Sequence, residues 1–557
     1  MALVGSICVA MLLCGAGSAA TAGSVLEASQ DDMKWWREAR FGLFVHWGPV
    51  SLKGMEISWS RGGDRPGCSA TAATGPIPVE EYDNLYKEFN PVEFDAREWV
   101  AMAQDAGMKY LVFTTKHHAG FCMFDSKLTD YTIMNSPFGR DILAELAEAC
   151  HEAGLGLGFY YSPPDWHHPD CLTENHSRYV EYLHGQLREL CTNYGKVDII
   201  WFDGLSGKAE DWQSEGLFGM IRGLQPDVLI NNRAGLPGDF GTPEQTVGGF
   251  DRDRPWESCI TIGTQWAWKP NDRTKSLEEC IRTLVMCAGG DGNLLLNVGP
   301  AASGTIEPDQ VERLREIGAW LNRYGESIYG TRGGPFMPTL WCASTNAGNT
   351  VYLHVFDWDG PGLALAPIDK AIVSARVLTG GTVEFEQSDE GIKIVVPSEH
   401  RDAIDTIVAL ELDGPAIDVA PREVTRSLTY GKAVRTSNVH KGEEKYDGAR
   451  AVDGNRRTRW ATDGGTREAW IEVDLGEPMT FGRVGIDESC GARIQAFELQ
   501  RRDGDAWKTF LNGTTAGPDW SRGFEPVTAR HVRLNILDAT EGPTIWEFNL
   551  YPPAWKE

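Results

Sequence analysis

The stretch "KVDIIWFDGLSG", residues 196–207, is an apolar run that ends abruptly at a carboxylate followed by a glycine. Its four consecutive apolar residues, 199–202, are typical of a strand covered on both faces, as in the parallel sheet of an α/β protein. Asp203 is therefore expected at the carboxyl end of that strand. In a closed parallel barrel this end carries the active site, so Asp203 is a catalytic candidate, although an Asp before a Gly is also a common turn or cap residue.

Similar strand-like segments recur from residue 36 to 325 and alternate with helical ones. The other expected strands are 41–47, 110–118, 156–162, 228–233, 258–263 and 292–300. Between them, "FDAREWVAMAQDAGMKY" predicts a helix capped by Asp95 and ended by Gly107, and another helix is expected to end at Gly154. Repeated β-α units favour a TIM-like (β/α)8 barrel, in the α/β class, over an open doubly wound sheet. No glycine-rich phosphate loop occurs, so a nucleotide site is not expected.

The sequence pattern changes after the barrel. Short alternating strands such as "TVYLHVFDW", separated by Gly, Pro and Asp turns, predict a small antiparallel β-sandwich over residues 333–420. A third unit, 421–557, is again all-β, with segments such as "RHVRLNIL". We therefore expect a catalytic barrel over residues 23–332 followed by two β-modules.

Composition narrows the function classes. The chain has 557 residues, and 79 acidic residues outnumber 52 Lys and Arg, which gives a formal net charge of −27. This balance disfavours a nucleic-acid partner or an anionic membrane surface. The 20 Trp residues suit stacking against the apolar faces of sugars, although ordinary packing in a core uses them as well.

The first residues predict a secretory signal peptide over 1–22, because an apolar run with small residues ends in the A-x-A sequence 20–22. The leader departs from the usual pattern in lacking a basic start. The prediction places the mature protein outside the cytoplasm, secreted or periplasmic. The ten Cys residues beyond the leader include no C-x-x-C pair, which argues against a zinc knot and leaves one or two disulfides open.

Polar and aromatic residues stand at the ends of five successive expected strands. They are His46 and Trp47, then Lys116, His117 and His118, then Tyr160 and Tyr161, then Asp203, then Arg233. Each alone is commonly structural, but parallel strands bring their carboxyl ends to one edge. Together they predict a pocket rich in hydroxyl-binding groups around one buried carboxylate.

The paired His117 and His118 raise the question of a metal site. Adjacent residues on a strand point to opposite faces, so both could bind one ion only if the strand has already ended. No carboxylate or third His follows at a short zinc-ligand spacing, which disfavours metal catalysis. A second pair, 167–168, lies in a polar, Pro-rich loop. A Ser-His-Asp triad would lack its usual G-x-S-x-G elbow.

Cleavage of a glycosidic bond needs two carboxyl groups, one to attack or activate water and one to protonate the leaving oxygen. Asp203 is the candidate for the first role. For the second, the region after the fifth expected strand offers Glu244 and Glu257. Glu244 is expected in a loop that can reach a leaving group, whereas Glu257 begins the next strand and would either serve the site or brace the barrel.

Eight motifs carry a resemblance to a known family. They are "RFGLFVHWG", "KHHAGFCMFDSKLTDY", "GFYYSPPDW", "IIWFDG", "INNR", "TPEQ", "WESCITIG" and "GDGNLLLNVGP". In order, and over most of residues 33–330, they resemble the α-L-fucosidases of glycoside hydrolase family 29. The resemblance implies a TIM-like barrel followed by a β-sandwich, a retaining double displacement, and no metal or other cofactor in the chemistry. It implies Asp203 as nucleophile and Glu244 as acid/base, with Glu257 as the alternative.

The resemblance also implies a set of substrate-binding residues. These are His46, Glu56, Trp59, His117, His118, Tyr160, Trp201 and Arg233, with Glu257 as a further candidate. Imidazole, carboxylate and guanidinium groups suit the ring hydroxyls of fucose, and an indole suits its methyl group. Trp59 departs from the family pattern, because two residues separate it from Glu56 in "MEISWS" whereas many relatives have the Glu and Trp adjacent.

The third unit has its own likeness. "GARAVDGNRRTRWAT", "WIEVDLG" and "IWEFNLY" resemble the discoidin-like fold of coagulation factors and of family 32 carbohydrate-binding modules. The resemblance implies a structural calcium ion, which prefers hard oxygen ligands. Its ligands would be side-chain oxygens of Asp453, Thr458 and Glu547 and backbone carbonyls of Ala451, or the residue before it, and Asn455. The alternative is a tight Asp-Gly turn without an ion.

The sequence thus predicts a secreted, exo-acting α-L-fucosidase that acts on fucosylated oligosaccharides or glycoconjugates, with no nucleic-acid partner and no membrane span. An enzyme on the same barrel that cleaves the similar α-L-galactosides is the alternative within the class. A catalytically silent glycan-binding protein is the alternative from another class, and the presence of Asp203 and Glu244 argues against it.

Overall fold

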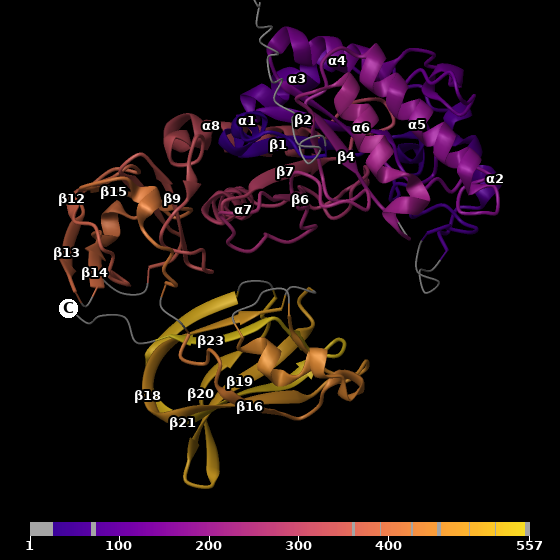
Figure 1. The fold of residues 1–557 in the computed structure, drawn as a ribbon. Helices are drawn as coiled ribbons and strands as arrows, with labels where there is room; N and C mark the ends of the chain where they lie inside the picture. Colours follow the sequence, from indigo (N-terminus) through magenta and orange to yellow (C-terminus); the bar gives the residue numbers. More distant parts are fainter. Residues whose placement is uncertain are drawn as a thin grey trace, which may run out of the picture.

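The structure, a computed structural model, describes residues 26–67, 74–205, 207–358, 362–389, 391–424, 427–453, 458–488, 491–517 and 520–551. The expected signal peptide, 1–22, lies outside the described residues. Figure 1 shows an α/β unit formed by the first part of the chain, an all-β unit beside it, and a second all-β unit formed by the C-terminal part.

The first unit is built on a seven-stranded, wholly parallel sheet in the order β5-β4-β3-β2-β1-β7-β6. Its strands are β1 (Phe41–Val45), β2 (Tyr110–Lys116), β3 (Gly156–Tyr161), β4 (Ile199–Phe202), β5 (Leu229–Ile230), β6 (Glu257–Thr261) and β7 (Asn293–Val298). All seven correspond to expected strands. Almost every residue in them is buried, as expected for strands with helices on one face and a filled interior on the other.

An irregular segment, residues 240–244, closes this sheet into a ring. Phe240 forms a parallel bridge with Asn231 beyond β5, and Glu244 forms one with Cys259 on β6. The backbone N–H of Gln245 donates to the Cys259 carbonyl at 2.9 Å, which continues this pairing. The segment therefore occupies the eighth strand position, and the predicted (β/α)8-like fold is confirmed.

Helices surround the ring. They are α1 (Gln30–Ala39), α2 (Val79–Asn84), α3 (Ala96–Asp105), α4 (Ile142–Ala153), α5 (His176–Asn193), α6 (Ser214–Leu224), α7 (Leu277–Gly289) and α8 (Pro308–Tyr324). The expected helix ends are confirmed. Asp95 accepts hydrogen bonds from the N–H groups of Arg97 and Glu98 at the start of α3. Gly154 ends α4 in the left-handed region, at φ 66°, where glycine carries no steric penalty.

The second unit consists of two antiparallel sheets, as predicted. One has the order β12-β15-β10-β9-β8 and the other β11-β14-β13. Their strands are β8 (Arg332–Gly333), β9 (Cys342–Ala347), β10 (Thr350–Val355), β11 (Gly362–Leu365), β12 (Ile372–Val377), β13 (Glu384–Ser388), β14 (Gly391–Val395) and β15 (Thr406–Leu412). Arg282 of α7 donates to the carbonyls of Phe356 and Ile404, which ties this unit to the barrel.

The third unit is a separate all-β body with its own apolar core. Its main sheet runs β16-β18-β21-β19-β20, and β23 also pairs with β18. The strands are β16 (Ala433–Thr436), β17 (Trp460–Ala461), β18 (Ala469–Asp487), β19 (Ile494–Asp503), β20 (Ala506–Gly513), β21 (Trp520–Ala539), β22 (Thr544–Ile545) and β23 (Glu547–Tyr551). An ion pair between Arg483 and Asp357 joins this unit to the second one.

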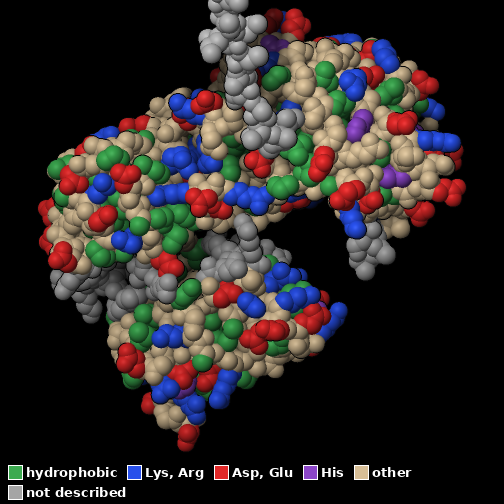
Figure 2. Space-filling view, viewed as in Figure 1, with side chains coloured by type: hydrophobic (Ala, Val, Ile, Leu, Met, Phe, Trp, Pro, Cys, Tyr) green, Lys and Arg blue, Asp and Glu red, His purple; other side chains and the backbone are tan. Residues whose placement is uncertain are grey.

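The surface and the cysteines bear on the remaining expectations. Acidic and basic side chains are interspersed on the face seen in Figure 2. Within the described ranges, no helix combines the length and the apolar character needed to cross a membrane.

The eight described cysteines are buried and unpaired, while Cys68 and Cys490 lie outside the described residues. No disulfide is therefore formed among the cysteines that the structure describes.

Candidate active site

The carboxyl ends of the barrel strands converge on a pocket with a volume of about 200 Å³. Its lining is Phe44, His46, Trp59, Gly67, His117, His118, Tyr160, Pro164, Trp166, Trp201, Asp203, Gly204, Arg233, Glu244, Cys259 and Trp266. The structure thus brings together the expected site residues of the barrel except Glu56 and Glu257, and of the strand-end residues Trp47, Lys116 and Tyr161 also lie outside this lining. The parallel register explains this convergence, because residues that follow parallel strands emerge at one end of the ring.

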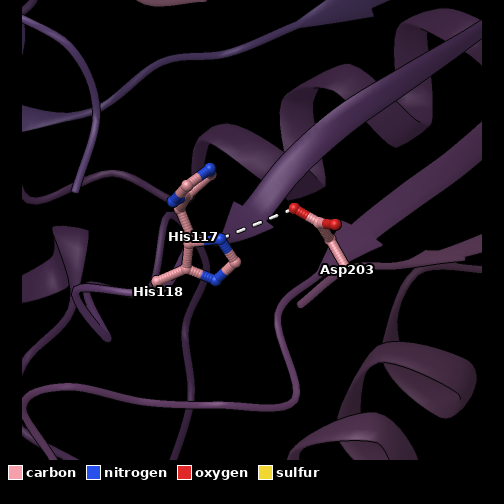
Figure 3. A group of neighbouring side chains, drawn as sticks. All are labelled: His117, His118 and Asp203. Carbon is pink, nitrogen blue, oxygen red and sulfur yellow. Dashed lines mark ion pairs between the residues drawn. The ribbon is translucent and has the colours of Figure 1, made fainter. Parts of the chain in front are cut away.

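Asp203 is held by three neighbours at the centre of this pocket. The Tyr160 hydroxyl donates to its Oδ2 at 2.9 Å, and Arg233 Nη1 donates to its Oδ1 at 2.6 Å. The Nε2 atom of His118 lies 3.5 Å from Oδ2, the contact that is drawn in Figure 3. These contacts fix the orientation of the carboxylate at the carboxyl end of β4.

The same neighbours set the ionisation of the carboxylate. Burial raises the pKa of Asp203, but His118, Arg233 and the hydrogen bonds lower it by more, so the net pKa lies below the ordinary value. Burial and the charge of Asp203 raise the pKa of Tyr160 well above its usual value, so the phenol stays a donor. Asp203 is therefore an ionised carboxylate at neutral pH, available as a nucleophile.

Each of the three pocket histidines is oriented by one hydrogen bond through Nδ1. His46 pairs with Asn297 Oδ1 at 2.6 Å, His117 with Ser58 Oγ at 2.7 Å, and His118 with Ser162 Oγ at 2.6 Å. Burial lowers the pKa of all three imidazoles, that of His46 to about 4. They are therefore neutral at physiological pH, and neutral imidazoles can each exchange one hydrogen bond with a sugar hydroxyl.

His117, His118 and Asp203 also offer ligand atoms within 4.8 Å of one another, a spacing that could hold a metal ion. Both imidazoles reach the same side because β2 has already ended at Lys116. However, the Arg233 guanidinium occupies one oxygen of the carboxylate, and its positive charge opposes a second cation there. The group of side chains in Figure 3 therefore fits hydroxyl recognition better than metal binding.

Glu244 lies at the end of the segment that closes the ring, and 45% of its side chain is exposed. Its Oε2 accepts from the same Arg233 Nη1 that binds Asp203, at 2.8 Å. The nearest oxygens of the two carboxylates are therefore no farther apart than the sum of these two distances. That limit lies below the separation of about 6.5–9.5 Å that inverting glycosidases need and is compatible with the about 5–5.5 Å of retaining ones.

Arg233 is itself fixed in this bridging position. Its Nε donates to Thr242 Oγ1 at 2.8 Å and its Nη2 to the Thr242 carbonyl at 2.9 Å. Its guanidinium also lies over the Trp201 ring, 4.8 Å from the ring centroid. Trp201 on β4 and Asp203, which directly follows β4, present this wall and the carboxylate to the same space.

Glu257 does not line the pocket, which corrects its assignment as a substrate-binding candidate. It is fully buried inside the barrel, where it accepts from Trp201 Nε1 at 3.0 Å and from the Tyr110 hydroxyl. The physical reason is its place at the start of β6, because the amino ends of the strands lie opposite the pocket. Glu257 therefore braces the barrel and holds the Trp201 indole from below.

Replacing Glu257 by alanine is expected to lower thermal stability, because two buried donors would lose their acceptor at a cost of about 1–3 kcal/mol each. Burial raises the pKa of Glu257 from 4.5 to about 7, so the folded state binds this proton more tightly than the unfolded chain. The resulting stability is complete below pH 4.5 and is lost as the pH rises through 7.

The control for this prediction is Glu257→Gln, which keeps an acceptor but cannot titrate. Between pH 5 and 8 the melting temperature of the wild type should fall by more than that of the Gln variant. Equal pH profiles for the two proteins would contradict a titrating carboxyl at this position.

Glu56 also lies outside the pocket lining. Its carboxylate accepts from the backbone N–H groups of Trp266 and Ala267 at 2.9 and 3.0 Å, and burial raises its pKa. It thereby holds the Trp266 loop against the pocket. Each carboxylate oxygen can still accept a further hydrogen bond, so contact of Glu56 with substrate stays a prediction.

The structure adds pocket residues that sequence reasoning did not single out. They are Phe44, Gly67, Pro164, Trp166, Gly204, Cys259 and Trp266. Trp166 ends the quoted motif "GFYYSPPDW", and Trp266 follows the strand 258–263 within five residues. An aromatic residue just beyond a strand end was therefore the sequence feature that could have identified both as pocket residues. The pair His167 and His168, in contrast, lies outside the lining, with both backbone N–H groups donating to Asp165.

The proposed calcium ligands are described only in part. Thr458 Oγ1 donates to the two oxygens of Asp453 at 2.9 and 2.8 Å. Ala451 and Glu547, the latter at the start of β23, are both buried. Asn455 lies outside the described residues. The side chains present are the hard oxygen donors that calcium prefers, so their chemistry fits the ion.

Comparisons with known proteins agree with this geometry. A model of the alpha-L-fucosidase family matches residues 20–326, and a model of the F5/8 type C domain matches residues 432–548. The chain is 30% identical to plasma alpha-L-fucosidase of Pongo abelii over 377 residues, which cover 61% of this chain and 80% of that protein. It is 28% identical to alpha-L-fucosidase of Dictyostelium discoideum over 402 residues, or 66% of this chain and 86% of that one.

Solved structures show the same likeness. The chain matches alpha-L-fucosidase isoenzyme 1 from Paenibacillus thiaminolyticus with a TM-score of 0.62 and 37% identity, covering 69% of this chain and 99% of that one. It matches a GH29 alpha-L-fucosidase from Bacteroides thetaiotaomicron, trapped as a covalent intermediate with 2-fluoro-fucosyl fluoride, with a TM-score of 0.62 and 30% identity, covering 70% and 97%.

Proposed function

The chain belongs to the alpha-L-fucosidase family of glycoside hydrolases and carries a C-terminal F5/8 type C domain, and from this we propose that it is a retaining exo-α-L-fucosidase. The observation that carries the proposal is Arg233 Nη1, which holds Asp203 and Glu244 together at 2.6 and 2.8 Å. An enclosed pocket around this pair suits one terminal sugar of a fucosylated glycan. The expected leader would carry the protein to a secreted or periplasmic location.

In the first step, the ionised Asp203 attacks the anomeric carbon and forms a covalent fucosyl ester, while the glycosidic oxygen leaves with a proton from Glu244. Arg233 contributes twice here, because it keeps Asp203 ionised and aims both carboxylates. Tyr160 donates to the oxygen of Asp203 that is not held by Arg233, which leaves the nucleophile with a fixed orientation.

In the second step, Glu244 takes a proton from a water molecule, which attacks the same anomeric carbon and releases Asp203. Two displacements at one carbon give overall retention. The exposure of Glu244 at the mouth supports this role, because the acid/base group must meet both the departing sugar and the incoming water. The neutral imidazoles of His46, His117 and His118 supply hydroxyl contacts that do not compete for the proton.

The direct test is hydrolysis of a chromogenic α-L-fucoside followed by NMR of the first-formed sugar. The proposal expects α-L-fucose before mutarotation. Release of the β-anomer would overturn the retaining mechanism, and absence of hydrolysis would overturn the activity. A parallel assay with the matching α-L-galactoside shows how far the pocket prefers the methyl group of fucose.

We further propose that the C-terminal domain binds calcium for structure and is dispensable for the chemistry. Every pocket residue precedes residue 267, and the domain has a core of its own. Deleting residues 425–557 should therefore leave hydrolysis of a small aryl fucoside within a few-fold of the full chain. Asp453 and Glu547 are distant in sequence, so an ion between them would stabilise the folded domain by mass action.

The readout for calcium is the melting of the full chain with and without a chelator. Chelation should lower the transition of the C-terminal domain and leave aryl-fucoside hydrolysis unchanged. An Asp453→Asn variant should melt at the chelated temperature regardless of calcium. A well-folded truncated protein without activity, or a domain whose melting ignores calcium, would each refute the corresponding half of the proposal.

A further inference from the structure

We propose that Trp59 is the platform on which the departing sugar ring of the substrate stacks, an inference that rests on the fucosidase activity proposed above. An exo-acting enzyme encloses the terminal sugar, so the rest of the glycan must cross the mouth of the pocket. Trp59 keeps 39% of its surface exposed there, whereas Tyr160 and Trp201 deeper in the pocket keep 1% each. It is the most exposed aromatic ring of the pocket lining, which places it where a leaving group crosses.

The Trp59 ring is held rigidly in place. Trp166 packs edge-on against it, with ring centroids 5.3 Å apart. The Arg65 guanidinium lies over both rings, 5.5 Å from the centroid of Trp59 and 5.4 Å from that of Trp166. Arg65 Nη2 also donates to the Trp59 carbonyl at 2.6 Å. A ring that is already fixed loses little conformational entropy when a ligand binds to it.

A strained turn points Trp59 toward the mouth and couples it to the sugar pocket. Ser58 is fully buried with a left-handed φ of 56°, a conformation that costs free energy for a non-glycine residue. Its Oγ accepts from the Ala119 N–H at 2.8 Å and pairs with His117 Nδ1 at 2.7 Å. The turn is thus locked by the same bond that orients a pocket histidine.

This turn also explains the spacing of "MEISWS". Glu56 is anchored on the Trp266 loop, and the residues between it and Trp59 carry the indole away from that anchor to the edge of His118, at a ring distance of 5.7 Å. Arg61, two residues after Trp59, is fixed by a bidentate ion pair with Asp83 at 2.7 Å. Both ends of the Trp59 segment are therefore anchored, and the indole forms a wall between pocket and solvent.

The chemistry of the platform defines its ligand class. An indole presents an apolar, electron-rich face, which matches the C–H face of a pyranose ring. The leaving group that fits is therefore a neutral sugar ring joined through the scissile oxygen, and a small or non-cyclic leaving group gains nothing from Trp59.

The test compares two donors that share fucose and differ in the leaving group. Trp59→Ala should lower kcat/KM for a fucosyl disaccharide roughly three- to tenfold more than kcat/KM for α-L-fucosyl fluoride, because fluoride is too small to touch the platform. Trp59→Phe should recover most of the loss. With fucosyl fluoride as donor, Trp59→Ala should also shift the product ratio from transfer onto an added sugar acceptor toward hydrolysis.

Trp507→Ala is the matched control, since Trp507 also lies under an arginine, Arg533, but in the C-terminal domain. It should leave both donors unaffected. Equal losses of Trp59→Ala on both donors would place Trp59 in the fucose pocket, and no loss on either would remove it from substrate binding. Both outcomes overturn the proposal while the fucosidase activity stands, whereas a wild type inactive on both donors refutes the proposed function itself.

Discussion

Replacing Asp203 by alanine is expected to reduce hydrolysis of an aryl α-L-fucoside by a factor on the order of 10⁴, the scale on which loss of a covalent nucleophile acts. The variant has no carboxylate to attack the anomeric carbon, and Arg233 retains a positive charge that only Glu244 still balances. The loss should appear in kcat and kcat/KM together, because Asp203 contributes mainly to the transition state.

Added azide should restore part of this activity, because the anion fits the space that the carboxylate vacates and attacks from the same face. A single displacement then gives β-L-fucosyl azide, with inversion. NMR of the product checks the assignment. Full activity of Asp203→Ala, or formation of the α-azide, would contradict attack by Asp203.

Asp198→Ala is the matched control for a lost acid near the same strand. Asp198 precedes the other end of β4, where it accepts from the Leu157 N–H at 2.9 Å and pairs with Lys196 at 2.6 Å. Its removal should lower the melting temperature, since a buried donor loses its partner, and leave the chemistry near wild type. An equal loss of turnover in both variants would show that the Asp203 effect is structural.

The barrel was predictable from sequence where local signals were strong. All seven expected parallel strands formed, because runs such as residues 199–202 are apolar throughout and can only be buried on both faces. The helix caps at Asp95 and Gly154 follow from side-chain and backbone chemistry within one turn. The eighth strand position, 240–244, was missed because its sequence, "FGTPE", carries Gly and Pro and pairs through scattered bridges only.

The site was predictable where a residue lies at the carboxyl end of a strand or directly after it. His46, Tyr160 and Asp203 meet because the parallel register carries strand ends to one edge. Trp266 was missed because its loop is held at the pocket by long-range contacts, such as the bond to Glu56, 210 residues away in sequence, and the bond from Asn297. The role of Glu257 could not be decided from sequence, because a carboxylate at the start of a strand gives the same pattern whether it faces the pocket or the barrel interior.

Glu244→Ala is the second variant with a large expected effect, and its size should depend on the leaving group. A sugar leaves as a poor alkoxide without a proton, so loss of the general acid should slow a fucosyl disaccharide by roughly 10²–10⁴-fold. A nitrophenolate needs little help, and an aryl fucoside should be slowed far less in its first step. Glu257→Ala, which acts through the support of Trp201, should slow both substrates alike.

Azide separates the two carboxylates by the stereochemistry of the product. In Glu244→Ala the fucosyl ester of Asp203 still forms from an aryl fucoside, and azide, which needs no general base, attacks it in place of water. Two displacements give α-L-fucosyl azide, the anomer opposite to that from Asp203→Ala. Because Arg233 binds both acids through one nitrogen, each variant also frees a hydrogen bond for the other acid. The anomer of the azide therefore distinguishes their roles more directly than the size of the loss does. Formation of the β-azide by Glu244→Ala would show that Glu244, and not Asp203, attacks the anomeric carbon. Equal slowing of both substrates would remove Glu244 from the acid/base role.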